Sequence, residues 1–241
     1  MQMIIIAGPA GAGKTTLAKM IAEQAFELGF IPELLSFAGS LKEEAKKMGF
    51  DKETKPKEYR KFCQKHGQGR REEDPDYWVK IFKKNLNIIR TKEDSDLDNN
   101  KKYWERCVIV DDCRHANEVE LGLKEKATMV FISYGDRPNP KQDEAWMNHE
   151  SEELNKAIDE HPEKFECVFP YVIDNNGSIA DLKVVAEDMT STWCNVGDIL
   201  IKEDKIKKIS RCVEELIDLL FLDSLEEEEE EDDEDFKHGA D

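Results

Sequence analysis

The strongest chemical signal lies close to the N-terminus, where residues 8–15 read GPAGAGKT and fit the pattern GxxxxGK[ST]. Glycines let backbone N–H groups converge on phosphate oxygens, and a helix that follows such a loop adds positive potential. Lys14 can then bridge the β- and γ-phosphates, and the Thr15 hydroxyl can ligate magnesium. A tight turn after an edge strand is the alternative without chemistry. The residues predicted to bind ATP are Gly8, Gly11, Ala12, Gly13, Lys14, Thr15 and Thr16.

A pair of carboxylates, Asp111 and Asp112, ends a second apolar run. In doubly wound folds, ligands bind at the carboxyl edge of the sheet, which is also the edge of the phosphate loop. One carboxylate can hold Mg²⁺-bound water there, and another can accept a hydrogen bond from a substrate. We predict Asp111 as a metal ligand together with Thr15, and Asp112 as a catalytic residue. A solvated turn that caps the next helix is the alternative for both.

Several arginines stand in polar segments, namely Arg60, Arg70, Arg71, Arg114 and Arg137. Transfer of a phosphoryl group between two anionic substrates needs cations around both, and the guanidinium group offers a bidentate fork for phosphate. We predict that Arg114 and Arg137 act in catalysis with Lys14, and that Arg70 contacts the acceptor. Each arginine could equally be a surface residue, and the acids in residues 72–76 could neutralise Arg70 and Arg71 locally.

Other candidates carry less weight. Trp78 lies in an apolar helical stripe, so it could stack on a base, although filling the core is the favoured role. His149 is a weak candidate for a general base, because transfer onto a phosphate acceptor needs none. The sequence contains no NKxD motif, which disfavours a GTPase.

The elements that must position these residues follow from apolar periodicity. Continuous apolar runs predict strands, and apolar residues at helical spacing predict helices. The predicted strands are 3–7, 34–38, 107–111, 129–132 and 167–173. The predicted helices are 14–28, 40–48 with Ser40 as its cap, 57–66 ending at Gly67, 76–89, 117–126, 152–158, 179–188 and 205–222, with a surface loop over 90–102. Repeated βα units predict an α/β fold of the P-loop NTPase type, an open parallel sheet with helices on both faces.

The charge pattern divides the chain into two parts. We predict a single kinase domain over residues 1–222 and a disordered acidic tail over 223–241. The net charge is −19, and ten of the negative charges fall within residues 226–235, which leaves about −9 for the rest. An acidic surface repels phosphate backbones and anionic lipid, so neither nucleic acid nor a membrane is an expected partner.

The six cysteines show no CxxC pair and no regular spacing, which is typical of free thiols in a reducing cytoplasm. The apolar start of the chain is too short for a signal peptide, so the expected location is cytoplasmic.

At this point the residues resemble the bacteriophage-type deoxynucleoside monophosphate kinases, within the P-loop nucleoside monophosphate kinase superfamily. The likeness spans most of residues 3–222, and only the phosphate loop is specific by itself. The other matching segments, in order, are 37–43 (FAGSLKE), Arg60 ahead of Gly67, 77–80 (YWVK), 110–114 (VDDCR), 117–118 (NE), 137–138 (RP), 149–152 (HESE) and 174–177 (DNNG).

The resemblance implies transfer from ATP, with Mg²⁺, to a deoxynucleoside monophosphate, in a fold with helical acceptor-binding and lid insertions. It implies host cytoplasm as the location if the source is viral. By position, Arg137 would belong to a mobile lid. The residues that would line the acceptor pocket are Lys42, Arg60, Trp78, Asp112, Arg114 and Glu118.

Two features depart from the family pattern. Several members carry aspartate after the loop lysine, where this chain has Thr15, and the acidic tail is not part of the pattern. Other phosphorylated acceptors stay open, of the phosphomevalonate or dephospho-coenzyme A type, as does a nucleotide-binding regulatory protein without catalysis. The accepted base and sugar are open as well, and so is the oligomeric state, with a homodimer as one option.

Overall fold

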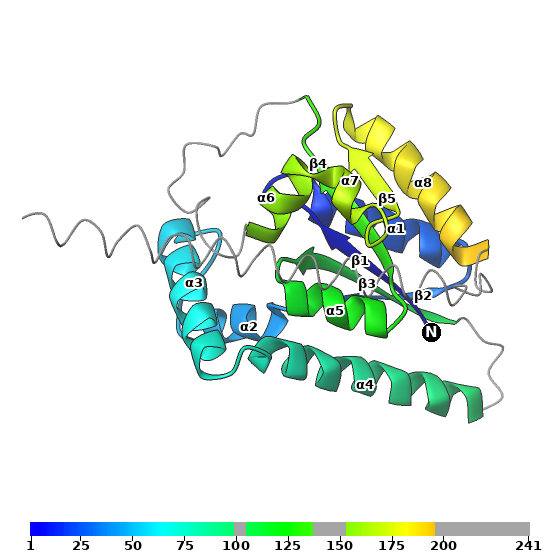
Figure 1. The fold of residues 1–241 in the computed structure, drawn as a ribbon. Coiled ribbons are helices and arrows are strands. Elements are labelled where there is room, and N and C mark those ends of the chain that lie inside the picture. Colours follow the sequence, from blue (N-terminus) through cyan, green and yellow to red (C-terminus); the bar gives the residue numbers. More distant parts are fainter. Residues whose placement is uncertain (99–104, 137–152, 196–241) are drawn as a thin grey trace, which may run out of the picture.

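The computed structural model describes residues 1–98, 105–136 and 153–195, and Figure 1 shows how its elements are arranged. The strands are β1 (Gln2–Ala7), β2 (Ile31–Leu35), β3 (Arg106–Cys113), β4 (Thr128–Ser133) and β5 (Tyr171–Asp174). The helices are α1 (Lys14–Glu27), α2 (Gly39–Lys47), α3 (Pro56–Glu73), α4 (Tyr77–Asp98), α5 (Ala116–Lys124), α6 (Glu153–Glu160), α7 (Pro162–Phe165) and α8 (Ile179–Asn195). The predicted helix 205–222, the acidic tail and the predicted lid with Arg137 lie outside the described residues.

The five strands form one sheet in the order β2-β3-β1-β4-β5, and every pairing is parallel. The N-terminal strand β1 lies at the centre, with Ile4 opposite Ile109 of β3 and Ile5 opposite Met129 of β4. Because a central strand of a parallel sheet is covered on both faces, its residues form a continuous apolar run. The predicted open parallel sheet is confirmed.

Alternate residues of β1 enter two separate cores. Ile4 and Ile6 pack with side chains of α1 and α8, whereas Met3 and Ile5 pack with side chains of α4, α5 and α6. Helices therefore cover both faces of the sheet, as predicted (Figure 1). This arrangement leaves the carboxyl ends of the strands at one edge, where the loops after β1, β3, β4 and β5 come together.

Helices α3 and α4 are longer than the sequence indicates. Gly67 was expected to end a helix, but α3 continues through it to Glu73. Gly67 instead lies where α3 approaches α2 closely, since a Cβ at this position would lie 3.1 Å from Cδ2 of Leu41 on α2. Likewise α4 extends to Asp98, across most of the predicted surface loop. Figure 1 shows α3 standing clear of the sheet, where α2 connects it to β2.

Smaller differences concern the ends of elements. The second strand occupies Ile31–Leu35 rather than 34–38, and the last covers only Tyr171–Asp174. Ser40 does not cap α2, because the helix already begins at Gly39 and Ala38 stands at the cap position.

Cys63, Cys107 and Cys113 are free thiols, as expected. Cys167 is disulfide-bonded, so the prediction that all six cysteines are free is wrong at this position. Among the residues that the structure describes, no helix combines the length and apolarity needed to cross a membrane.

Candidate active site

The loop between β1 and α1 has the backbone conformation that its sequence predicts. Gly8, Gly11 and Gly13 all have positive φ angles, of 142°, 93° and 111°, a region that side-chain-bearing residues rarely adopt. At Gly8 a side chain would also collide with the carbonyl oxygen of Ile132 on β4. These glycines let the chain pass closely over the sheet and turn into α1, which is the context that a phosphate-binding loop requires.

Lys14 lies over this loop and is almost fully buried, with 7 % of its surface exposed. Its ammonium donates to the carbonyl oxygen of Pro9 at 2.8 Å and also to that of Gly8. The charge is therefore held above the loop, at the place where the phosphates of a bound nucleotide would lie.

Thr15 and Asp111 meet at the carboxyl edge of the sheet. The hydroxyl group of Thr15 donates to Oδ2 of Asp111 at 2.6 Å, although the two residues are 96 positions apart in the sequence. A hydroxyl and a carboxylate oxygen are the kind of ligands that Mg²⁺ takes in proteins, with water and substrate phosphates completing its shell. The pair predicted from sequence is thus brought together, and its chemistry fits a magnesium ion.

Asp112 points into a turn rather than into open space. Its carboxylate accepts hydrogen bonds from the hydroxyl of Ser36, from the backbone N–H of Phe37 at 2.8 Å and of Ala38 at 3.2 Å, and from Lys42 at 2.9 Å. Burial by itself raises the pKa of Asp112, but the Lys42 ammonium and the hydrogen bond from Ser36 outweigh it, so the pKa lies below its ordinary value. Asp112 therefore stays ionised and holds the β2–α2 turn with Lys42. In this geometry Asp112 positions Lys42, and its catalytic role stays a prediction.

Glu118 has the opposite titration behaviour. Its carboxylate accepts the backbone N–H groups of Arg114 at 2.7 Å and His115 at 3.2 Å, which caps α5. Burial, followed by the negative charge of Asp112, raises the pKa of Glu118 to about 7. Arg71 acts against this shift. Glu118 thus contacts the start of its own helix, and its contact with a substrate stays a prediction.

The two neighbouring arginines of α3 lie on different sides of the helix. Arg71 reaches the side that packs on α2, where its Nη1 would lie 3.5 Å from a Cβ on Gly67 and its charge acts on Glu118. Arg70 instead pairs with Glu73 at 3.2 Å and lies over the ring of Tyr77 at 5.2 Å. Of the two, Arg71 is the arginine whose charge acts on Glu118, and the contact of Arg70 with an acceptor stays a prediction.

Arg70 also lines a surface pocket of about 550 Å³, together with Phe50 and Phe62. Arg60 lies on α3 as well. Arg60 is half-buried there.

Trp78 is part of the core. Only 1 % of its surface is exposed, and its indole N–H donates to the carbonyl oxygen of Gly67 at 3.0 Å. Tyr77 and His66 contact the ring edge-on. Because almost none of the ring is exposed, a base cannot stack on it in this arrangement, and the predicted stacking role has no support in the structure. The structural role that the sequence favoured for Trp78 is the observed one, and it joins α4 to α3.

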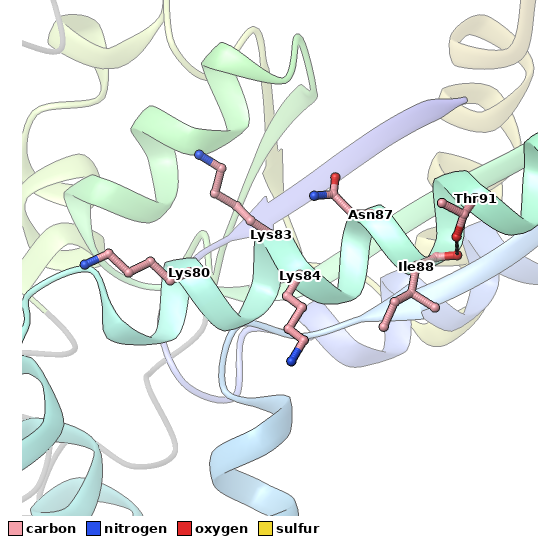
Figure 2. A pocket seen from close by; sticks show the side chains of 6 residues that line it. All are labelled: Lys80, Lys83, Lys84, Asn87, Ile88 and Thr91. Carbon is pink, nitrogen blue, oxygen red and sulfur yellow. Dashed lines mark hydrogen bonds between the residues drawn. The ribbon is translucent and has the colours of Figure 1, made fainter.

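A second surface pocket, of about 540 Å³, is formed by one face of α4 alone, as Figure 2 shows. Its lining residues are Lys80, Lys83, Lys84, Asn87, Ile88 and Thr91. Lys80 is paired with Asp74 at 2.7 Å. Val79, Phe82 and Leu86 of α4 point to the opposite side, into the core, so this face is the solvent side of the helix. None of the lining residues belongs to the phosphate loop.

Three polar residues near the phosphate loop were missed by the sequence analysis. They are Tyr134, Asn155 and Asn175, and each one bonds to the backbone of residues 8–12. Tyr134 and Asn175 directly follow β4 and β5, so their position at the carboxyl edge of the sheet was a usable signal. Nothing in the sequence indicates that Asn155, on α6, reaches the loop.

No family model matches this sequence, and no curated protein matches it. Among solved structures, four chains match this chain, and one of them is the shikimate kinase from Acinetobacter baumannii in complex with shikimate. That chain is 18 % identical to this one, and the match covers 83 % of this chain and 96 % of the kinase with a TM-score of 0.39. The fold of the present chain is defined by its own sheet order and by the glycine loop after β1: it is a parallel α/β fold of the P-loop NTPase type.

Proposed function

We propose that this chain is an ATP- and Mg²⁺-dependent kinase that phosphorylates a nucleoside monophosphate. A deoxynucleoside monophosphate is the preferred acceptor because of the family resemblance. The observation that carries the proposal is the hydrogen bond between Thr15 and Asp111, at 2.6 Å, directly beside the phosphate loop. This bond places two oxygen ligands, from Thr15 and Asp111, at the same edge of the sheet as the phosphate-binding loop.

The donor side consists of the loop and the first turn of α1. Its backbone N–H groups would bind the phosphates of ATP, and Lys14 would neutralise charge on the β- and γ-phosphates. Thr15 and Asp111 would hold Mg²⁺, which when bound neutralises the charge that develops on the phosphate oxygens. In this arrangement the chain contributes mainly position and charge.

The acceptor side is built around Lys42. The carboxylate of Asp112 holds its ammonium at 2.9 Å, and 46 % of the side chain remains exposed. Arg71 comes from the side of α3 that faces α2, Arg60 lies on the same helix, and Arg114 follows β3. We assign to these cations the phosphate of the acceptor. Arg137 would add a further cation during transfer, in accordance with its place in the family pattern.

The reaction needs no general base. An oxygen of the acceptor phosphate is already ionised at neutral pH, so it attacks the γ-phosphorus directly. The bond between this phosphorus and the bridging oxygen breaks, and ADP leaves with the electron pair. Trp78 is not assigned a contact with the base, because its ring is buried.

The test is ADP release coupled to a spectrophotometric readout, with Mg-ATP and a panel of nucleoside and deoxynucleoside monophosphates. Lys14→Ala is the control for the donor site. We expect turnover that depends on one or more monophosphates and disappears in the control. Shikimate, phosphomevalonate and dephospho-coenzyme A complete the panel as acceptors of other classes.

Turnover on one of these other compounds alone would keep the kinase and replace the acceptor. Binding of Mg-ATP without turnover on any compound would overturn the proposal in favour of a nucleotide-binding protein without catalysis.

A further inference from the structure

A phosphate-binding loop must turn its N–H groups inward, which directs its carbonyl groups outward. The peptide unit is planar and trans, so the C=O of one residue and the N–H of the next point in opposite directions. A carbonyl oxygen that is directed away from the phosphates still needs a hydrogen-bond donor when it is buried. The donors to these oxygens therefore decide whether the loop is formed before a nucleotide arrives.

The carbonyl of Ala10 is held by Tyr134, the residue after β4. The phenol hydroxyl donates to this oxygen, and Tyr134 is 8 % exposed, so the bond is buried. The same peptide unit carries the N–H of Gly11. When the Ala10 oxygen is fixed toward Tyr134, the Gly11 N–H must point to the opposite side.

The carbonyl of Ala12 is held in the same manner by Asn175, in the turn after β5. Its side-chain Nδ2 donates to the Ala12 oxygen at 2.7 Å. A Cβ on Gly13 would lie 2.7 Å from this nitrogen, so the glycine leaves the space that the amide group occupies. The backbone N–H of Asn175 bonds in turn to Ser133 at 3.2 Å, which fixes the turn to the end of β4.

Glycine follows the held carbonyl in both peptide units. Gly11 and Gly13 have φ angles of 93° and 111°. Glycine populates positive and negative φ about equally, so nothing in its own conformation resists rotation of the preceding peptide unit. Without an external donor, either unit can turn and present its oxygen to the incoming phosphates.

We propose that Tyr134 and Asn175 are positioning residues that lock these two peptide units, so that the N–H groups of Gly11 and Gly13 face the donor phosphates. Asn155 fixes the start of the loop from α6, because its Oδ1 accepts the N–H of Gly8 at 2.9 Å. The inference rests on the proposed donor site, but it is independent of which acceptor the kinase uses.

The test compares two variants, Tyr134→Phe and Asn175→Ala, with wild type by calorimetric titration of Mg-ATP. Tyr171→Phe is the matched control, because it removes the same hydroxyl group from a half-buried tyrosine on β5. A buried carbonyl that loses its donor favours the turned peptide, so we expect each variant to bind Mg-ATP about tenfold more weakly. The control should bind as wild type does, and the KM of the acceptor should change less than twofold in all variants.

If the two residues had a purely structural role, their loss would lower the melting temperature and weaken Mg-ATP binding and acceptor binding alike. A second readout is therefore the ¹⁵N-labelled amide of Gly11, whose resonance should shift on addition of Mg-ADP in wild type and much less in Tyr134→Phe. Unchanged Mg-ATP affinity in both variants, or equal weakening of donor and acceptor, would overturn the inference. If wild type binds Mg-ATP and the variants match it, the proposed function stands and only this inference falls.

Discussion

Replacing Glu118 with glutamine should make the protein more stable at neutral and alkaline pH. Glutamine keeps a side-chain oxygen that can accept the N–H of Arg114, so the cap of α5 is retained. What disappears is a buried carboxyl group whose pKa is raised from 4.5 to about 7 by burial and by the charge of Asp112. The variant therefore tests the electrostatic cost of this carboxylate apart from its hydrogen bonds.

The sign follows from proton linkage. Between pH 4.5 and 7 the unfolded chain loses the proton of Glu118 while the folded chain keeps it. Stability must fall with rising pH wherever the folded state binds more protons. A shift of this size corresponds to about 3 kcal/mol of unfolding free energy. This stability is fully present below pH 4.5 and is lost as the pH rises to about 7 and above.

Urea unfolding at pH 5, 6, 7 and 8 measures this effect. We expect wild type and Glu118→Gln to differ little at pH 5, and the variant to become more stable by up to about 3 kcal/mol at pH 8. Glu120→Gln makes the same chemical change on the exposed side of α5 and reports the background. A difference between Glu118→Gln and wild type that stays constant from pH 5 to pH 8 would refute the reasoning.

Three further predictions concern the site. Thr15→Val removes the hydroxyl but keeps the shape, so the Mg²⁺ concentration for half-maximal activity should rise about tenfold, and an unchanged titration would contradict the metal assignment. Arg71→Gln should raise the KM of the acceptor about tenfold while Arg70→Gln leaves it near wild type, and steady-state kinetics with the reverse order would restore Arg70 to the site. Trp78→Phe should cost about 1–3 kcal/mol in urea unfolding without changing the preference among bases, since a lost preference would mean that the ring contacts the acceptor.

Some parts of the site could be predicted because their constraints are local. Glycines with positive φ angles and the Lys14–Thr15 step define the phosphate loop within eight consecutive residues. The meeting of Thr15 with Asp111 was predictable for a different reason. Thr15 follows β1 after the phosphate loop, and Asp111 lies near the end of β3. Parallel strands bring such positions to one edge of the sheet.

The choice between Arg70 and Arg71 was beyond the sequence. Glycine is a frequent helix terminator, so Gly67 indicated an end at this point and left the direction of the following residues undefined. The helix instead continues through Gly67, where α2 lies close, and one step along a helix turns a side chain by about 100°. The position at which α3 ends thereby decides which of the two arginine side chains lies on the side of Glu118.

The buried carboxylates explain how an acidic chain can present cations to a phosphorylated acceptor. Exposed at the site, Asp112 and Glu118 would repel the phosphate that Lys42 is proposed to bind. Backbone N–H groups occupy both carboxylates instead, and Glu118, with its pKa raised to about 7, is largely protonated below neutral pH. The ammonium of Lys42 stays partly exposed while its counter-charge is buried. Hence a net charge of −19 over the whole chain does not set the sign of the potential that the acceptor meets.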